Sequence, residues 1–132
     1  MSALDHVGIN AIDYEKSKAF YVAALAPLGL KVLSDFGFAC GFGADHPFLW
    51  LAATEKPVDG AEFGTGRPGH MHIALSAPDH ATVDAFYTAA LAAGGTDNGK
   101  PGLRPEYHEA YYGAFVLDPD GHNIEAVCHV PA

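Results

Sequence analysis

The chain has few cations and few cysteines. Seven Lys and Arg face sixteen Asp and Glu, for a formal charge of −9. An acidic chain lacks the basic surface that binds phosphate backbones, so we expect no nucleic-acid partner. Two cysteines cannot build a disulfide framework, which favours a reducing, cytoplasmic compartment.

Long apolar runs are also missing. No stretch reaches the ~18–20 apolar residues of a membrane span, and the first residues lack the basic and apolar regions of a signal peptide. We therefore expect no membrane partner. The 132 residues are enough for a single domain, 1–132, with a sizeable core.

Histidine, in contrast, is abundant. Eight histidines accompany only seven Lys and Arg. Imidazole is a common metal ligand, so this composition directs attention to metal binding.

An internal repeat organises the whole chain. Residues 6–29 and 72–95 align at a constant offset of 66 residues with eleven identities, including the pairs His6/His72 and Asp13/Asp79. Two copies are too few for a solenoid. We predict one domain with repeat one at about 1–53, a Gly- and Pro-rich linker at about 54–69, and repeat two at about 70–132.

Each copy reads as β-α-β-β-β. An alternating strand precedes an aspartate in the N-cap position, and a helix follows at 14–27 or 80–93. Further strands are expected at 30–34, 37–43 and 47–53, and at 96–98, 111–117 and 122–129. Residues 99–110 are predicted to form a loop that covers a site. The predicted fold is α+β, with both repeats forming one curved mixed sheet and the helices on its outer face.

Three polar residues share the strand face opposite the helices. His6 and His72 occupy equivalent positions in the two first strands, and Glu125 interrupts an apolar strand, where a carboxylate is costly to bury. Two imidazoles and one carboxylate are a ligand set for Fe(II), Mn(II), Zn(II) and neighbouring ions. The sequence thus predicts a metal site of His6, His72 and Glu125.

Two other histidines are alternative candidates for metal ligands. His70 shares the face of His72, and the repeat offset selects His72. His129 shares the face of Glu125 but lies near the chain end, where a surface role is expected.

These patterns resemble the vicinal oxygen chelate superfamily, which includes glyoxalase I, extradiol dioxygenases, and fosfomycin- and bleomycin-resistance proteins. The resemblance is carried by residues 4–9, 70–75, 79–87 and 117–125, the last reading Leu-Asp-Pro-Asp-Gly-His-Asn-Ile-Glu. It implies a cup-shaped sheet in which His6, His72 and Glu125 match three metal-ligand positions. Trp50 falls at the fourth position, where glyoxalase I has a carboxylate.

The resemblance also implies a divalent metal cofactor (Fe, Mn, Ni or Zn) and a small-molecule substrate. The candidate catalytic residues are His108, Tyr107 and Tyr112, with Tyr111 as an alternative to Tyr112 because the facing of that pair is uncertain. The candidate substrate pocket consists of Phe48, Trp50, Asn10 and Arg104.

Two functions remain open at this point. The first is a metal-dependent lyase, isomerase or extradiol-type dioxygenase that chelates a small oxygenated molecule. The alternative is a drug- or metabolite-binding protein of the bleomycin-resistance type, without catalysis. Proteins that resemble this chain often pair through strand edges, so a homodimer is expected.

Overall fold

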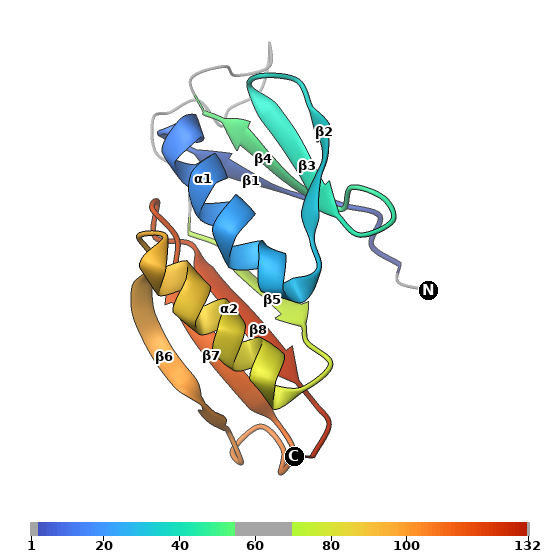
Figure 1. The fold of residues 1–132 in the computed structure, drawn as a ribbon, viewed down its shortest axis with the longest axis vertical. Coiled ribbons are helices and arrows are strands. Elements are labelled where there is room, and N and C mark those ends of the chain that lie inside the picture. The colour runs from blue at the N-terminus through green and yellow to red at the C-terminus, as the bar shows by residue number, and fades with distance from the viewer. Residues whose placement is uncertain (1–2, 55–69, 132) are drawn as a thin grey trace.

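The computed structural model describes residues 3–54 and 70–131. The first repeat contains β1 (Val7–Ala11), α1 (Tyr14–Leu25), the short 3-10 helix η1 (Ala26–Leu28), β2 (Lys31–Asp35), β3 (Ala39–Gly43) and β4 (Leu49–Ala53). The second contains β5 (His72–Ser76), α2 (His80–Ala92), β6 (Thr96–Leu103), β7 (Tyr112–Leu117) and β8 (Asn123–Cys128). The predicted α+β fold of two βαβββ repeats is confirmed (Figure 1).

Each repeat forms its own four-stranded mixed sheet. The strand orders, β1-β4-β3-β2 and β5-β8-β7-β6, are equivalent under the repeat. The first and last strands of each repeat, β1 with β4 and β5 with β8, are parallel, and the other pairs are antiparallel. Among the described residues the strands form two separate sheets. The predicted curved sheet is therefore not closed into a barrel within one chain.

The helices begin where the sequence predicts. The Asp13 side chain accepts a hydrogen bond from the Lys16 amide, and that of Asp79 accepts one from the Thr82 amide, so both are N-caps. The first helix tightens into η1 at Pro27 and stops at Gly29, whose φ of 77° favours glycine.

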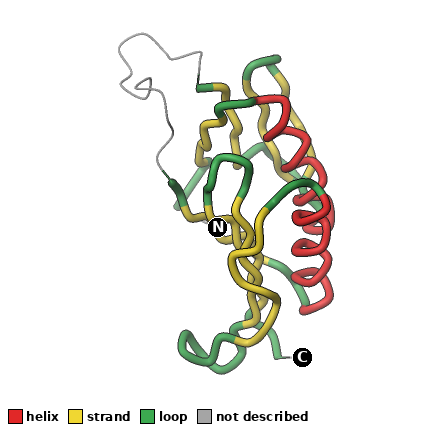
Figure 2. Tube along the Cα trace, turned by 90° about the vertical axis from the view of Figure 1, so that its left-hand side faces the viewer, coloured by secondary structure: helices red, strands yellow, loops and turns green. Residues whose placement is uncertain are grey.

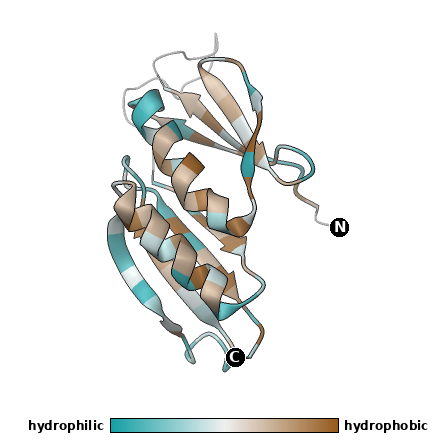
Figure 3. Ribbon diagram, in the orientation of Figure 1, coloured by the Kyte–Doolittle hydropathy of each residue, from teal (hydrophilic) through white to brown (hydrophobic). Residues whose placement is uncertain are grey.

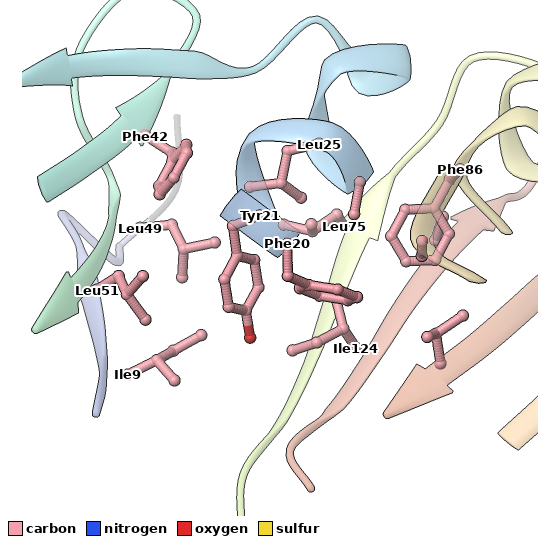
Figure 4. Close-up of a cluster of buried hydrophobic side chains, with 14 of the residues drawn as sticks. Ile9, Phe20, Tyr21, Leu25, Phe42, Leu49, Leu51, Leu75, Phe86 and Ile124 are labelled. Carbon is pink, nitrogen blue, oxygen red and sulfur yellow. The ribbon is translucent and has the colours of Figure 1, made fainter. Parts of the chain in front are cut away.

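The core lies between the helices and both sheets. Phe20, Tyr21 and Leu25 of α1 sit between side chains of the first sheet and those of the second, such as Ile124 (Figure 4). Both helices lie on one side of the strands (Figure 2), and α1 packs against α2. The two repeats therefore share one hydrophobic core.

The main departure from the sequence prediction is β6. It runs from Thr96 to Leu103, not 96–98, and its pairing with β7 shifts register around Gly99. Glycines and a proline made this stretch resemble a loop, whereas it is a bulged, largely hydrophilic edge strand (Figure 3). The loop predicted at 99–110 therefore begins only after Leu103.

The predicted linker, apart from Thr54, lies outside the described residues. Within the described part, no helix has the length and apolar character needed to cross a membrane.

Candidate functional site

His72 and Glu125 meet on the face of the second sheet that points away from α2. They lie on the adjacent parallel strands β5 and β8, where Ala74 is the register partner of Glu125. The Nε2 atom of His72 is 3.2 Å from Oε1 of Glu125. Glu125 is 1% exposed, whereas about half of the His72 side chain is accessible.

The tautomer of neutral His72 follows from the hydrogen bond of its second ring nitrogen. Nδ1 lies 3.1 Å from the carbonyl oxygen of Asn123, which can only accept a hydrogen bond. In neutral His72 the proton therefore lies on Nδ1, and the lone pair of Nε2 points at the carboxylate. Two acceptors at this distance need a proton or a cation between them.

The other oxygen of Glu125 is held by Tyr111. The Tyr111 hydroxyl donates to Oε2, and Gly113 leaves room for this arrangement, since a Cβ there would lie 3.1 Å from Oε2. Burial, followed by the hydrogen bond to Glu125, raises the pKa of Tyr111, so the phenol stays protonated as a donor. The sequence prediction named Tyr112 as a catalytic candidate, with Tyr111 as the alternative, and in the structure it is Tyr111 that lies at the carboxylate.

His6 stands apart from this pair within one chain. Its Nδ1 is 2.7 Å from Asp5 Oδ1, and this hydrogen bond lowers the pKa of Asp5. His6 lines a cavity of about 730 Å³ with residues that include His46, Phe48 and Ala74. Among the described residues, His6, His72 and Glu125 do not form a group whose ligand atoms all lie within 4.8 Å.

The predicted apolar wall is partly present on the first sheet. Trp50 lies over Gly41, where a Cβ would be 2.9 Å from the indole, and stacks on Phe36 at 5.8 Å and 9° between ring planes. Phe36 is 64% exposed, so one face of this aromatic platform is open. Phe36 lies in the turn between β2 and β3, and sequence reasoning did not select it.

The other predicted pocket residues serve local contacts. The Asn10 carbonyl accepts a hydrogen bond from His122. The Arg104 guanidinium donates to the carbonyls of Lys100 and Gly102 and lies 5.4 Å from the centre of the Phe115 ring. Phe115 stacks on His72, so Arg104 lies on the same face of the sheet as the His72–Glu125 pair.

The predicted catalytic residues divide between the two faces. His108 contacts His129 and Tyr111, and Tyr107 contacts Tyr111, so both lie in the loop beside Glu125. The Tyr112 hydroxyl instead donates to Asp84 of α2 at 2.7 Å, and its ring stacks on His80. Because successive strand residues alternate, Tyr112 faces the helix while Tyr111 faces the site.

A second group of side chains, which the sequence analysis did not select, has its potential ligand atoms close enough together to hold a metal ion. Ligand atoms of Asp118, Asp120 and His122 lie within 4.8 Å of one another. Their spacing of two residues in the turn after β7 is the signal that could have revealed them.

Hydrogen bonds within the protein account for the positions of these three side chains without a metal ion. Asp118 accepts from the Tyr21 hydroxyl at 2.5 Å and from the amides of Asp120 and His122. The Met71 amide donates to Nδ1 of His122, and Nε2–H donates to the Asn10 carbonyl. Both ring nitrogens are thus engaged, which favours a structural role in joining the two repeats.

The comparisons with known proteins agree with this fold. The family model of the Glyoxalase/Bleomycin resistance protein/Dioxygenase superfamily matches residues 3–126. No curated protein sequence matches the chain at the significance required.

Solved structures give further likenesses. A glyoxalase/bleomycin resistance protein from Albidiferax ferrireducens T118 is 27% identical, with a TM-score of 0.76, covering 96% of this chain and 98% of the other. A glyoxalase/bleomycin resistance protein/dioxygenase family enzyme from Burkholderia phytofirmans PsJN has 20% identity and a TM-score of 0.76, over 98% and 100% of the chains. Lactoylglutathione lyase from Agrobacterium tumefaciens has 22% identity and a TM-score of 0.67, over 97% and 94%.

Proposed function

The chain belongs to the glyoxalase/bleomycin resistance protein/dioxygenase superfamily, and we propose that it is a metal-dependent enzyme of the glyoxalase or dioxygenase type. Its substrate is a small oxygenated molecule that chelates a divalent ion (Fe, Mn, Ni or Zn) through two oxygens. His72, Glu125 and a third ligand, His6, hold the ion.

The observation that carries this proposal is the orientation of His72 toward Glu125. A lone pair and a carboxylate oxygen face each other at 3.2 Å, while the other imidazole nitrogen is bound to a backbone carbonyl. Metal-binding histidines commonly fix their tautomer in this way, so the pair fits a divalent ion. Among the described residues, the ion-pair partner of Glu125 is this histidine.

We propose that His6 comes from a second copy of the chain. The His6 side chain is 57% exposed and directly precedes β1, an outer strand of the first sheet. β5, which carries His72, is an outer strand of the second sheet. A homodimer that brings the start of β1 from one copy to β5 of the other completes the three-ligand set.

When bound, the metal supplies Lewis acidity toward adjacent oxygens or, as iron, reactivity with O₂. Tyr111 orients the Glu125 carboxylate by donating to its far oxygen. The open face of the Phe36–Trp50 platform provides a flat apolar surface for substrate. Of the loop candidates, we assign proton transfer to Tyr107, because both ring nitrogens of His108 are engaged by the Ala110 amide and by His129.

The alternative function is a binding protein without catalysis. The same aromatic platform supports it, because stacked exposed rings bind planar ligands without help from a metal.

Metal analysis of untagged protein tests the proposal. Glu125→Gln should lower the affinity for Mn(II) by at least tenfold, because a neutral amide replaces a carboxylate ligand, whereas His70→Ala should leave it unchanged. The loaded protein is then assayed against catechols with O₂ and against 2-oxoaldehyde–thiol adducts. If no metal binds while an aromatic ligand binds the metal-free protein, the binding-protein function is correct.

A further inference from the structure

Two exposed histidines connect the loop after β6 to the end of β8. His108 lies in that loop, and His129 directly follows β8. Nε2 of His108 is 2.8 Å from Nδ1 of His129, and the rings stack with centroids 5.0 Å apart. We refer to this pair as the histidine clasp.

The hydrogen bonds around the clasp fix its tautomers. The Ala110 amide donates to Nδ1 of His108 at 3.2 Å, so that nitrogen carries a lone pair and the proton of neutral His108 is on Nε2. Nε2–H then donates to Nδ1 of His129, whose own proton is on its Nε2. Both acceptors in this chain of bonds are therefore unprotonated imidazole nitrogens.

The histidine clasp packs against Tyr111, the residue whose hydroxyl caps Glu125. The ring of Tyr111 meets the His108 and His129 rings edge-on, with centroids 5.4 and 5.3 Å away. The Tyr111 amide donates to the His108 carbonyl at 3.1 Å, and its hydroxyl donates to Glu125. The Arg104 amide also donates to the Tyr111 carbonyl at 2.7 Å, so the loop and the clasp pack directly against the residue that caps Glu125.

The titratable and charged groups around the clasp come from the loop and from β8. Tyr111 faces both rings, and Tyr107 contacts Tyr111 with ring centroids 4.9 Å apart. The charge of Arg104 acts on Tyr111, and Glu125 lies beneath the Tyr111 hydroxyl. The remaining charged loop residues, Glu106 and Glu109, are exposed.

We propose that His129 is a positioning residue: acting through His108, it holds the loop of residues 104–111 closed so that Tyr111 caps Glu125, and this closure is released in acid. Imidazole is the side chain that gains a proton between about pH 8 and pH 5. Only the expected effect of this closure on metal binding rests on the proposed function.

The release follows from counting acceptors. One added proton keeps the bond between the rings only if Nδ1 of His108 becomes protonated, either directly or because the proton of His108 moves there when His129 is protonated. In both cases His108 gives up the bond from the Ala110 amide. A second proton leaves four N–H groups and no acceptor. The loop then loses the side-chain bond that fastens it to His129 after β8, and also its internal bond from the Ala110 amide to His108.

The test uses metal-free protein in EDTA and three variants, His129→Ala, His129→Gln and the control His46→Gln. Long-range ¹H–¹⁵N spectra at pH 8 report which nitrogens of His108 and His129 carry protons. Amide-exchange protection factors of Ala110 and Tyr111, corrected for the intrinsic rate at each pH, report loop closure. Mn(II) affinity at pH 8 and pH 6 is measured separately.

In wild type we expect His108 to be protonated on Nε2 at pH 8 and Tyr111 protection to fall on the order of tenfold by pH 5. His129→Ala should show the low protection already at pH 8. His129→Gln, whose amide oxygen accepts from Nε2–H but does not titrate, should stay closed to pH 5, and His46→Gln should match wild type. Unchanged protection in His129→Ala, or equal protection of wild type at pH 5 and pH 8, would overturn the proposal.

The metal measurement distinguishes the two proposals. If Mn(II) binds, His129→Ala should weaken it several-fold at pH 8 and His129→Gln should restore it. If Mn(II) does not bind to any form while the exchange data follow the clasp, the metal function is wrong and the clasp stands.

Discussion

At the scale of single residues, the position of Glu125 depends on its neighbours in space. Its two oxygens face different partners, His72 and Tyr111, and the missing side chain of Gly113 leaves room for the second contact. A buried carboxylate is costly unless its oxygens are hydrogen-bonded or bind a cation, so Tyr111 both stabilises Glu125 and aims Oε1 at His72.

Replacing Tyr111 with Phe tests this role. Loss of the hydroxyl frees the carboxylate to rotate, and outer-shell substitutions at metal sites commonly cost about tenfold or more in affinity. We expect Mn(II) affinity, measured by calorimetry, to fall by about that factor. Tyr112→Phe is the matched control, because its hydroxyl bonds Asp84 on the helix side and should not affect the metal. Equal affinities for both variants would show that Tyr111 does not orient the ligand.

At the scale of elements, the glycines at one pair of equivalent repeat positions, Gly29 and Gly95, are needed for different reasons. Gly29 has a φ of 77° and open space around its Cβ position, so it is needed for its backbone conformation. At Gly95 an added Cβ would lie 2.5 Å from Val116 Cγ1, 2.8 Å from Phe20 Cε1 and 2.9 Å from the Ala90 carbonyl oxygen. That glycine is needed because β7, α1 and the end of α2 pack closely around it.

The two glycines therefore predict different substitution costs. Gly95→Ala should lower the free energy of unfolding by about 1–3 kcal/mol, because the backbone oxygen of Ala90 cannot move aside cheaply. Gly29→Asn should cost less than about 1 kcal/mol, since Asn tolerates the left-handed conformation. Urea denaturation measures both. A Gly95→Ala protein as stable as wild type would contradict the close packing of α1 on the second repeat.

The elements also show what sequence reasoning can reach. Helix starts were predictable because aspartate N-caps and the repeat offset mark them independently. Strand alternation predicted that His72 and Glu125 share a face, whereas their adjacency depends on the parallel pairing of β5 with β8. Strand β6 was underestimated, because the bulges that accommodate Gly99 and Gly102 interrupt any alternating pattern.

The choice between Tyr111 and Tyr112 illustrates the remaining limit. Two adjacent tyrosines fit both faces of a strand equally well, so composition cannot decide which one faces the site. The contact with Asp84, 28 residues away in sequence, shows the orientation of Tyr112. The partnership of Phe36 with Trp50 was also hidden, because it depends on how the β2–β3 turn folds over the sheet.

At the scale of the whole molecule, the turn after β7 joins the two repeats. Asp118, Asp120 and His122 bond to Tyr21, Ile12 and Asn10, all in the first repeat. These contacts, of which the Tyr21–Asp118 bond is buried, and α1 packed between the sheets together set the relative orientation of the repeats. That orientation leaves His6 outside the His72–Glu125 group of its own chain, a result that the symmetry of the sequence alone could not give.

If His6 acts in a second copy, two defective chains should rescue each other. His6→Ala and Glu125→Gln each remove one ligand, so each homodimer lacks an intact site. In a dimer of one chain of each kind, one site combines the His6 of the Glu125→Gln chain with the Glu125 of the His6→Ala chain, and the other site lacks both ligands.

Random pairing of equal amounts makes half of the dimers mixed, so about a quarter of all sites should be intact. We expect co-refolded mixtures to recover about that fraction of the wild-type Mn(II) stoichiometry at high affinity. A mixture of Glu125→Gln with His72→Ala is the control, because both of these residues belong to the same half of the site and no pairing can restore it. Recovery in neither mixture, with a dimer confirmed by light scattering, would show that each site draws its three ligands from one chain.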